Sequence, residues 1–125
     1  MPFVTDTHPL VWKMSDDPKL SEKVKRIFSE EYIFIPCIVL FELLYLVEKK
    51  KIAADFESFL VLISSSKNYR IEPLCLPIIE RSRRIPREKV ADPWDRLIAA
   101  TSMHLSCPLI TQDESLKKIG LEVIW

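Results

Sequence analysis

Short apolar segments alternate with helical patterns along the whole chain, and this alternation limits the fold more than any other feature. The predicted strands are residues 3–5, 32–35, 69–72, 108–111 and 122–125. The predicted helices are residues 8–14, 21–28, 37–47, 53–65, 77–85, 92–105 and 114–119. Strands in such βα units pair in parallel and are covered on both faces, so the alternation predicts an α/β protein with a central parallel sheet. A length of 125 residues without linkers or repeats predicts one domain, residues 1–125.

Composition excludes several classes of protein. The single glycine, Gly120, rules out the glycine-rich phosphate loops of P-loop and dinucleotide-binding folds. Eighteen Lys and Arg balance 18 Asp and Glu, so any basic surface for nucleic acid must be local. Three widely spaced cysteines favour buried, reduced thiols over disulfides or a zinc site. The longest apolar run, residues 37–47, is too short to span a bilayer, and we expect a cytoplasmic protein without a membrane partner.

Glu42 is the one charged residue within that apolar run. An ionised carboxylate in such surroundings costs on the order of several kcal/mol unless a cation or hydrogen bonds compensate it. Three explanations are open: a salt bridge to Arg or Lys of another element, a helix edge that reaches solvent, or a bound metal ion.

Four aspartates stand where predicted strands end or helices begin. Asp6 follows the first strand and Asp113 the fourth, and the carboxyl ends of parallel strands form the ligand-binding edge of such sheets. Each also has a structural explanation, since Asp6 suits a turn and Asp113 the N-cap of the next helix. Asp92 and Asp95 lie three residues apart at one helix start. Asp92 precedes a proline and is a typical N-cap, so Asp95 is the better ligand of the two.

Carboxylates gathered from four elements would repel one another without a counter-ion. A divalent cation between Asp6, Glu42, Asp95 and Asp113 removes that repulsion. Oxygen ligands without a His or Cys cluster favour Mg²⁺ or Mn²⁺ over zinc. Such a site activates water and holds a phosphodiester for in-line attack, so the predicted reaction is metal-assisted phosphodiester hydrolysis.

Four segments carry a family resemblance: Val-Thr-Asp-Thr-His-Pro-Leu-Val-Trp at 4–12, Phe-Glu-Leu at 41–43, Asp-Pro-Trp-Asp-Arg-Leu-Ile-Ala-Ala at 92–100 and Leu-Ile-Thr-Gln-Asp at 109–113. In this order and spacing the chain resembles, over essentially its whole length, the PIN-domain ribonucleases of the VapC type. These are the toxins of type II toxin–antitoxin pairs.

The resemblance implies a three-layer α/β/α sandwich and an endoribonuclease that hydrolyses RNA with metal-activated water. Its catalytic and metal-binding acids match Asp6, Glu42, Asp95 and Asp113, and its cofactor is Mg²⁺ or Mn²⁺. Asp92, Thr111 and Arg96 are expected to support the site. The family commonly has Ser or Thr near the glutamate, where this chain has Pro36-Cys37. The resemblance also implies a homodimer and a cognate antitoxin protein that holds the toxin inactive.

Other residues near these motifs have weaker signals. His8 is expected to make a hydrogen bond at the start of the first helix rather than to act as a general base. Basic residues cluster at 49–51 and 81–89, and either stretch could contact the RNA backbone.

Two alternative functions stay open: a PIN-fold nuclease of host RNA processing, and a non-catalytic α/β interaction module. A receiver domain would have a second acid beside the first and a lone acid after the middle strand. A haloacid-type phosphatase would have an Asp two residues after the first. Thr7 and His8 follow Asp6 here, so both of these families are disfavoured.

Overall fold

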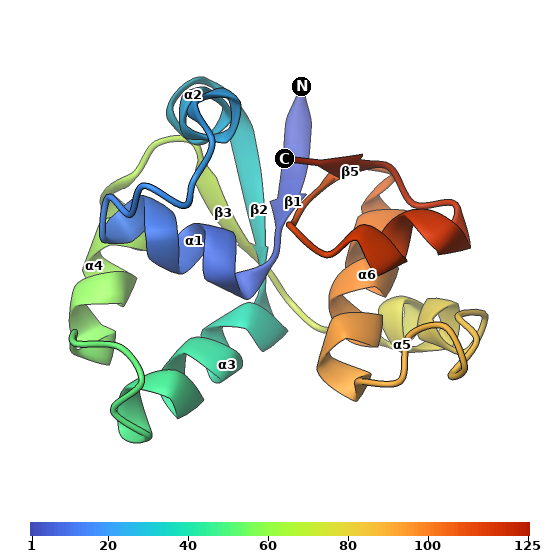
Figure 1. Cartoon of the computed structure of the whole chain (residues 1–125). Coiled ribbons are helices and arrows are strands. Elements are labelled where there is room, and N and C mark those ends of the chain that lie inside the picture. Colours follow the sequence, from blue (N-terminus) through green and yellow to red (C-terminus); the bar gives the residue numbers. More distant parts are fainter.

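A computed structural model describes residues 1–125, and at its centre lies a five-stranded sheet in the order β3-β2-β1-β4-β5 (Figure 1). The strands are β1 (Pro2–Thr5), β2 (Tyr32–Pro36), β3 (Tyr69–Glu72), β4 (Leu109–Ile110) and β5 (Val123–Ile124). The helices are α1 (Thr7–Met14), α2 (Glu22–Glu30), α3 (Cys37–Glu48), α4 (Phe56–Ser65), α5 (Leu76–Ser82) and α6 (Pro93–Leu105), followed by the 3₁₀ helix η1 (Glu114–Ile119). All strand pairs are parallel, which confirms the predicted class.

Helices cover both faces of the sheet. Figure 1 shows α1, α3 and α4 on one side of the sheet and α5 and α6 on the other, which gives the expected α/β/α layers. The core between the layers is aliphatic, because the strands are buried on both faces. Its fully buried side chains include Val4, Ile33 and Ile35 of the strands and Leu10 and Leu43 of the helices.

Some element boundaries differ from the sequence predictions. The helix predicted to start at residue 53 starts at Phe56, because the Asp55 carboxylate accepts the Ser58 N–H at 2.8 Å and fixes the N-cap there. The helix predicted over 77–85 ends at Ser82. Residues 114–119 form a 3₁₀ helix that ends, as predicted, at Gly120, which has a φ of 80°.

The cysteines and the helix lengths test two further expectations. All three thiols are free, but only Cys107 is buried, since Cys37 is exposed and Cys75 is intermediate. The prediction of three buried thiols was therefore wrong, because the first turn of α3 and the N-cap of α5 lie at the surface. None of the helices is both long enough and apolar enough to cross a membrane.

The strand order creates one position where the chain changes direction. The connections after β1 and β2 step toward β3, whereas the chain re-enters at β4 on the other side of β1 and continues to β5. The loops after β1 and β4 therefore leave toward opposite faces and open a crevice at the carboxyl ends of these two strands. Thr5 pairs with Ile110 at this edge, so Asp6 and Thr111 follow side by side.

Candidate active site

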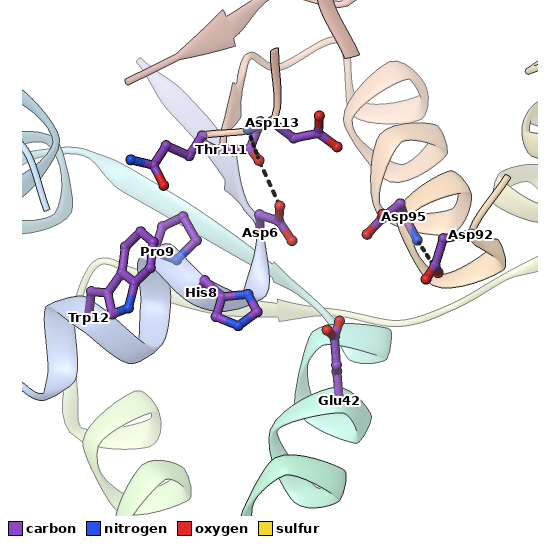
Figure 2. A pocket seen from close by; sticks show the side chains of 10 residues that line it. Asp6, His8, Pro9, Trp12, Glu42, Asp92, Asp95, Thr111 and Asp113 are labelled. Carbon is purple, nitrogen blue, oxygen red and sulfur yellow. Dashed lines mark hydrogen bonds between the residues drawn. The ribbon is translucent and has the colours of Figure 1, made fainter. Parts of the chain in front are cut away.

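The crevice beyond β1 and β4 holds a pocket of about 350 Å³ with an unusually acidic lining (Figure 2). Its lining side chains are Asp6, His8, Pro9, Trp12, Glu42, Asp92, Asp95, Thr111, Gln112 and Asp113. All four sequence-predicted acids, and Asp92, thus reach one pocket from four different elements. No Lys or Arg is part of the lining. The pocket concentrates five carboxyl groups without a fixed cation to balance them.

Asp6 lies at the centre of this group and is held by two hydrogen bonds. Its Oδ1 accepts the N–H of Thr7 at 2.7 Å, which caps α1, and its Oδ2 accepts the Thr111 hydroxyl at 2.7 Å. The backbone N–H of Asp6 donates to the Ile110 carbonyl at 3.0 Å. The β1–β4 pairing and the helix start therefore fix this carboxylate in one orientation.

Glu42 enters the pocket from α3, below Asp6 in the view of Figure 2. Its Oε1 accepts the hydroxyl of Thr7 at 2.7 Å, and it has no salt bridge. Burial raises the pKa of Glu42, the Thr7 hydrogen bond lowers it, and the charge of Asp6 raises it again. The salt-bridge explanation for this carboxylate was wrong: a neutral hydroxyl is its protein partner.

Asp95 projects into the pocket from the first turn of α6 and is the most perturbed of the acids. Burial, and after it the charges of Asp6, Asp92, Glu42 and Asp113, together raise its pKa from 3.8 to about 7. Figure 2 shows its carboxylate turned toward Asp6 across the crevice. In the absence of a cation, Asp95 is therefore the group that takes up a proton to relieve the crowding of negative charge.

Asp92 and Asp113 act as helix caps as well as lining the pocket. Asp92 Oδ1 accepts the N–H of Trp94 at 2.8 Å and caps α6, with a proline at N1 as the sequence predicted. Asp113 Oδ1 accepts the N–H of Ser115 at 3.0 Å and its hydroxyl at 2.6 Å, and caps η1. Both residues are therefore N-caps, as the sequence suggested, and both also line the pocket.

Thr111 connects two of the acids. Its hydroxyl donates to Asp6 and accepts the N–H of Asp113 at 3.1 Å. Thr111 is 1% exposed, so this hydroxyl has little access to water and keeps its bonds to the two aspartates. The expected supporting role of Thr111 thus takes the form of a bridge between the ends of β1 and β4.

The oxygen donors of the pocket suit a divalent cation. Five carboxylates and the hydroxyl of Thr111 fit a hard ion such as Mg²⁺ or Mn²⁺, and the mutual repulsion of the carboxylates calls for positive charge. However, no three His, Cys, Asp or Glu side chains are positioned to hold a metal ion as they stand. The acids therefore share a pocket without forming a closed ligand cage.

Two predicted residues behave differently from expectation. Arg96 does not line the pocket; its Nη2 donates to the carbonyls of Ser82 at 2.8 Å and Ile85 at 3.2 Å and so ties the loop after α5 to α6. His8 does not hydrogen-bond the start of α1, because Asp6 occupies the capping position. Its exposed ring instead lies 5.9 Å from the ring of Trp12 and lines the pocket.

Several residues of the site carried no clear signal in the sequence. Thr7 donates its hydroxyl to Glu42 from α1, 35 positions away in the sequence. Trp12 lines the pocket because it lies one helical turn beyond His8 in α1. Gln112 lines it because it precedes Asp113. Side chains one helical turn apart share a face, and that spacing from His8 was the only available indication for Trp12.

Comparison with known proteins gives a family and several similar folds. The family model of the PIN domain matches residues 3–121. A search of curated protein sequences finds no match. VapBC2 of Rickettsia felis, solved bound to a DNA fragment from its promoter, superposes with a TM-score of 0.76 at 23% identity, covering 99% of this chain and 98% of that one.

Two further solved structures have the same fold. VapBC-1 of nontypeable Haemophilus influenzae has a TM-score of 0.68 at 18% identity, covering 99% of this chain and 97% of that one. VapC20 of Mycobacterium tuberculosis, a toxin that cleaves the Sarcin-Ricin loop, has a TM-score of 0.70 at 13% identity, covering 97% and 96%. At these identities the similarity establishes the fold.

Proposed function

Because this chain belongs to the PIN domain family, we propose that it is an endoribonuclease that depends on Mg²⁺ or Mn²⁺ and hydrolyses RNA phosphodiester bonds. The observation that carries the proposal is the convergence of Asp6, Glu42, Asp95 and Asp113 on one pocket without a Lys or Arg in its lining. Uncompensated carboxylates at the carboxyl ends of parallel strands are suited to a hard cation. When bound there, Mg²⁺ or Mn²⁺ would supply a water nucleophile and an electrophile for the phosphate oxygen.

The protein's own side chains have distinct tasks in this proposal. Asp6, fixed by Thr7 and Thr111, is the preorganised ligand. Glu42, Asp95 and Asp113 would complete the acidic set around a bound cation. Its positive charge would lower the pKa of Asp95, which burial and the neighbouring acids raise, and so favour the ionised carboxylate. The hydroxyls of Thr7 and Thr111 hold the carboxylates of Glu42 and Asp6, and Oε2 of Glu42 accepts no hydrogen bond from the protein.

We further propose that the nuclease is the toxin of a toxin–antitoxin pair and acts in the cytoplasm. The fold shared with VapBC proteins supports this role. An apolar groove of about 370 Å³ supports a protein partner: it is lined by Val11 and Met14 of α1, Phe59 and Leu62 of α4, and the loop before α4. A short reading frame directly upstream that encodes a DNA-binding protein is expected, and its absence would favour host RNA processing while leaving the nuclease proposal intact.

A homodimer is proposed from a second apolar surface. The exposed side chains of Phe41 and Tyr45 on α3, Leu76 and Ile79 on α5, and Trp94 on α6 belong to helices in mutual contact, α3 with α6 and α6 with α5. The rings of Phe41 and Trp94 lie 5.5 Å apart. Exposed aromatic and aliphatic side chains grouped in this way are typical of subunit interfaces.

The decisive experiment measures RNA cleavage by the purified chain with and without divalent cations. We expect cleavage with Mg²⁺ or Mn²⁺, none with EDTA, and a loss of at least about 100-fold in Asp95→Asn, as for removal of a group that stabilises transition-state charge. Glu88→Gln, which alters an exposed loop carboxylate outside the pocket, is the matched control and should cleave normally. Undiminished cleavage by Asp95→Asn would refute the site, and cation-bound but inactive protein would favour the interaction module.

A further inference from the structure

A second groove adjoins the acidic pocket along α1, and its charge is opposite. It has a volume of about 360 Å³ and is lined by His8, Val11, Trp12, Ser15, Asp17, Lys19, Leu46, Lys51 and Ile52. His8 and Trp12 line both this groove and the acidic pocket, so the two are continuous. The groove is therefore an extension of the proposed active site away from its carboxylates.

The face of α1 that connects them follows from helix geometry. His8, Trp12 and Ser15 are spaced four and three residues apart and so project from one side of the helix. Asp6 caps this helix inside the acidic pocket, and the same side leads outward to Lys19 and Lys51. Figure 2 shows His8 next to Asp6 and Trp12 further along α1.

The two lysines are available for an anionic ligand. The Lys19 ammonium lies 5.6 Å from the centre of the Trp12 ring, a distance typical of a cation–π contact, and 3.9 Å from Asp17 Oδ2. The Lys19 side chain is 65% exposed, so most of its ammonium faces solvent. Lys51 is exposed and has no carboxylate partner. Asp17 offsets one of the two charges only in part, because its contact with Lys19 is long and exposed.

We propose that Lys19 and Lys51 bind the phosphates of the RNA strand next to the bond that is cleaved, with Trp12 holding Lys19 in position. The inference rests on the proposed nuclease function. A strand that enters a pocket of five carboxylates needs positive charge beside it, since RNA phosphates are repelled by the acids. Cations placed along one side of that pocket fix the strand's position without reading its sequence.

The two basic stretches of the sequence differ in their relation to this groove. Lys51 of the stretch 49–51 lines it, whereas no residue of the stretch 81–89 does. Arg81 instead lines a cavity beside the carboxyl end of α6, with Met103 and Ser106. Arg83 is already paired with Glu80 at 2.8 Å.

The test measures binding of a fluorescein-labelled single-stranded RNA by anisotropy, in the Asp95→Asn background to prevent cleavage. Lys19→Ala and Lys51→Ala should each weaken binding roughly five- to tenfold at low salt and reduce the slope of log Kd against log salt by about 0.7, the value for one phosphate contact to a single strand. Lys67→Ala removes the same charge before the amino end of β3, whereas the acidic pocket lies at the carboxyl ends of the strands, and it should change neither quantity. Thermal unfolding of all three variants checks that the fold is intact.

Cleavage by the same substitutions in the otherwise unaltered chain separates this proposal from the nuclease proposal. Lys19→Ala with Lys51→Ala should raise KM more than it lowers kcat, because the lysines act on binding. An active chain whose double variant binds RNA with unchanged Kd and salt slope overturns the groove and leaves the nuclease standing. If the chain cleaves no RNA but the double variant still loses RNA affinity, the nuclease proposal is refuted and the groove proposal stands. Loss of a co-expressed protein partner with unchanged RNA affinity assigns the groove to protein and overturns the proposal.

Discussion

Both carboxylate oxygens of Asp6 make structural hydrogen bonds. Oδ1 caps α1 and Oδ2 accepts the Thr111 hydroxyl, so substitution by alanine removes structural bonds as well as a charge. The structure identifies Asp6→Asn as the cleaner variant, because an amide oxygen can still accept the Thr7 N–H.

We predict that Asp6→Ala loses about 1 kcal/mol of stability, or about 3–6 °C in Tm, whereas Asp6→Asn stays close to the parent protein. Both variants should lose metal-dependent RNA cleavage, since both remove the charge. Thermal melts by circular dichroism and a gel-based cleavage assay measure the two effects. Equal Tm values for Asp6→Ala and the parent would contradict the capping role.

Asp95 makes the stability of the metal-free protein depend on pH. Its pKa rises from 3.8 in the unfolded chain to about 7 in the folded chain, so between these values the folded state holds a proton that the unfolded state has released. The free energy of unfolding therefore falls as pH increases from about 4 to about 7. The stability that the protonated Asp95 contributes to the folded state is fully present below about pH 4 and is lost above about pH 7.

In EDTA, we predict that Asp95→Asn and the parent have the same Tm near pH 4. At pH 8 the variant should have the higher Tm, with a free energy of unfolding larger by about 1–2 kcal/mol after allowing for solvent screening. The amide cannot ionise and so avoids the repulsion. Added Mg²⁺ should reverse the order by stabilising the parent protein. Glu88→Gln is the control for loss of one surface carboxylate. Parallel Tm curves for the parent and Asp95→Asn from pH 4 to 8 would rule out the perturbed pKa.

At the scale of elements, caps decide where the functional side chains stand. Helices α1 and α6 and the 3₁₀ helix η1 each start at an aspartate of the pocket, namely Asp6, Asp92 and Asp113. A carboxylate at a helix start is stabilised by the free N–H groups and the helix dipole. Three helix starts directed at one crevice therefore offset part of the cost of crowding these acids in the metal-free protein.

For α6, we predict that Asp92→Ala lowers stability by about 1 kcal/mol, whereas Asp92→Ser keeps it within about 0.5 kcal/mol, because a serine hydroxyl also accepts the Trp94 N–H. Asp92→Ser should retain most RNA cleavage, in contrast to Asp95→Asn. Urea unfolding and initial cleavage rates provide the two readouts. If Asp92→Ser cleaves RNA as poorly as Asp95→Asn, Asp92 takes part directly in the site in addition to capping α6.

At the scale of the whole molecule, the strand order places the two surfaces of interest on different helices. The apolar groove for a protein partner lies between α1 and α4, whereas the proposed dimer surface lies on α3, α5 and the start of α6. In Figure 1, α1, α3 and α4 lie on one side of the sheet and α5 and α6 on the other. The proposed dimer surface therefore includes helices from both sides of the sheet, and it shares no residue with the lining of the groove between α1 and α4.

We predict that the double variant Phe41→Asp, Leu76→Asp converts a dimer into a monomer. In a two-fold symmetric interface each substitution occurs in both subunits, so it places two charges in the interface. Both side chains are exposed in the single chain, at 53% and 67%, so the fold should be retained. Val61→Asp, at a residue of α4 that is 63% exposed, is the matched control and should remain dimeric. Sedimentation velocity measures the change; a parent protein that is monomeric at all concentrations would refute the dimer.

Local sequence patterns were sufficient to predict the fold class and the four acids of the pocket. Apolar runs of strand length alternating with helical patterns have few arrangements other than a parallel α/β sheet, because buried strands need helices on both faces. A glutamate inside an apolar helix and aspartates at the ends of strands were conspicuous because burying or crowding negative charge is costly. These signals depend on local sequence and on the energy of single groups.

Only the tertiary structure decided which groups meet. The hydroxyl partner of Glu42 is Thr7, 35 positions away, and Asp6 meets Thr111 across 105 positions because β1 pairs with β4. The role of Arg96 as a tie to the loop after α5, and the groove that joins Trp12, Lys19 and Lys51 to the acids, also depend on how helices pack. Such contacts follow from strand order and helix packing, which bring distant residues together without leaving a pattern in their local sequence.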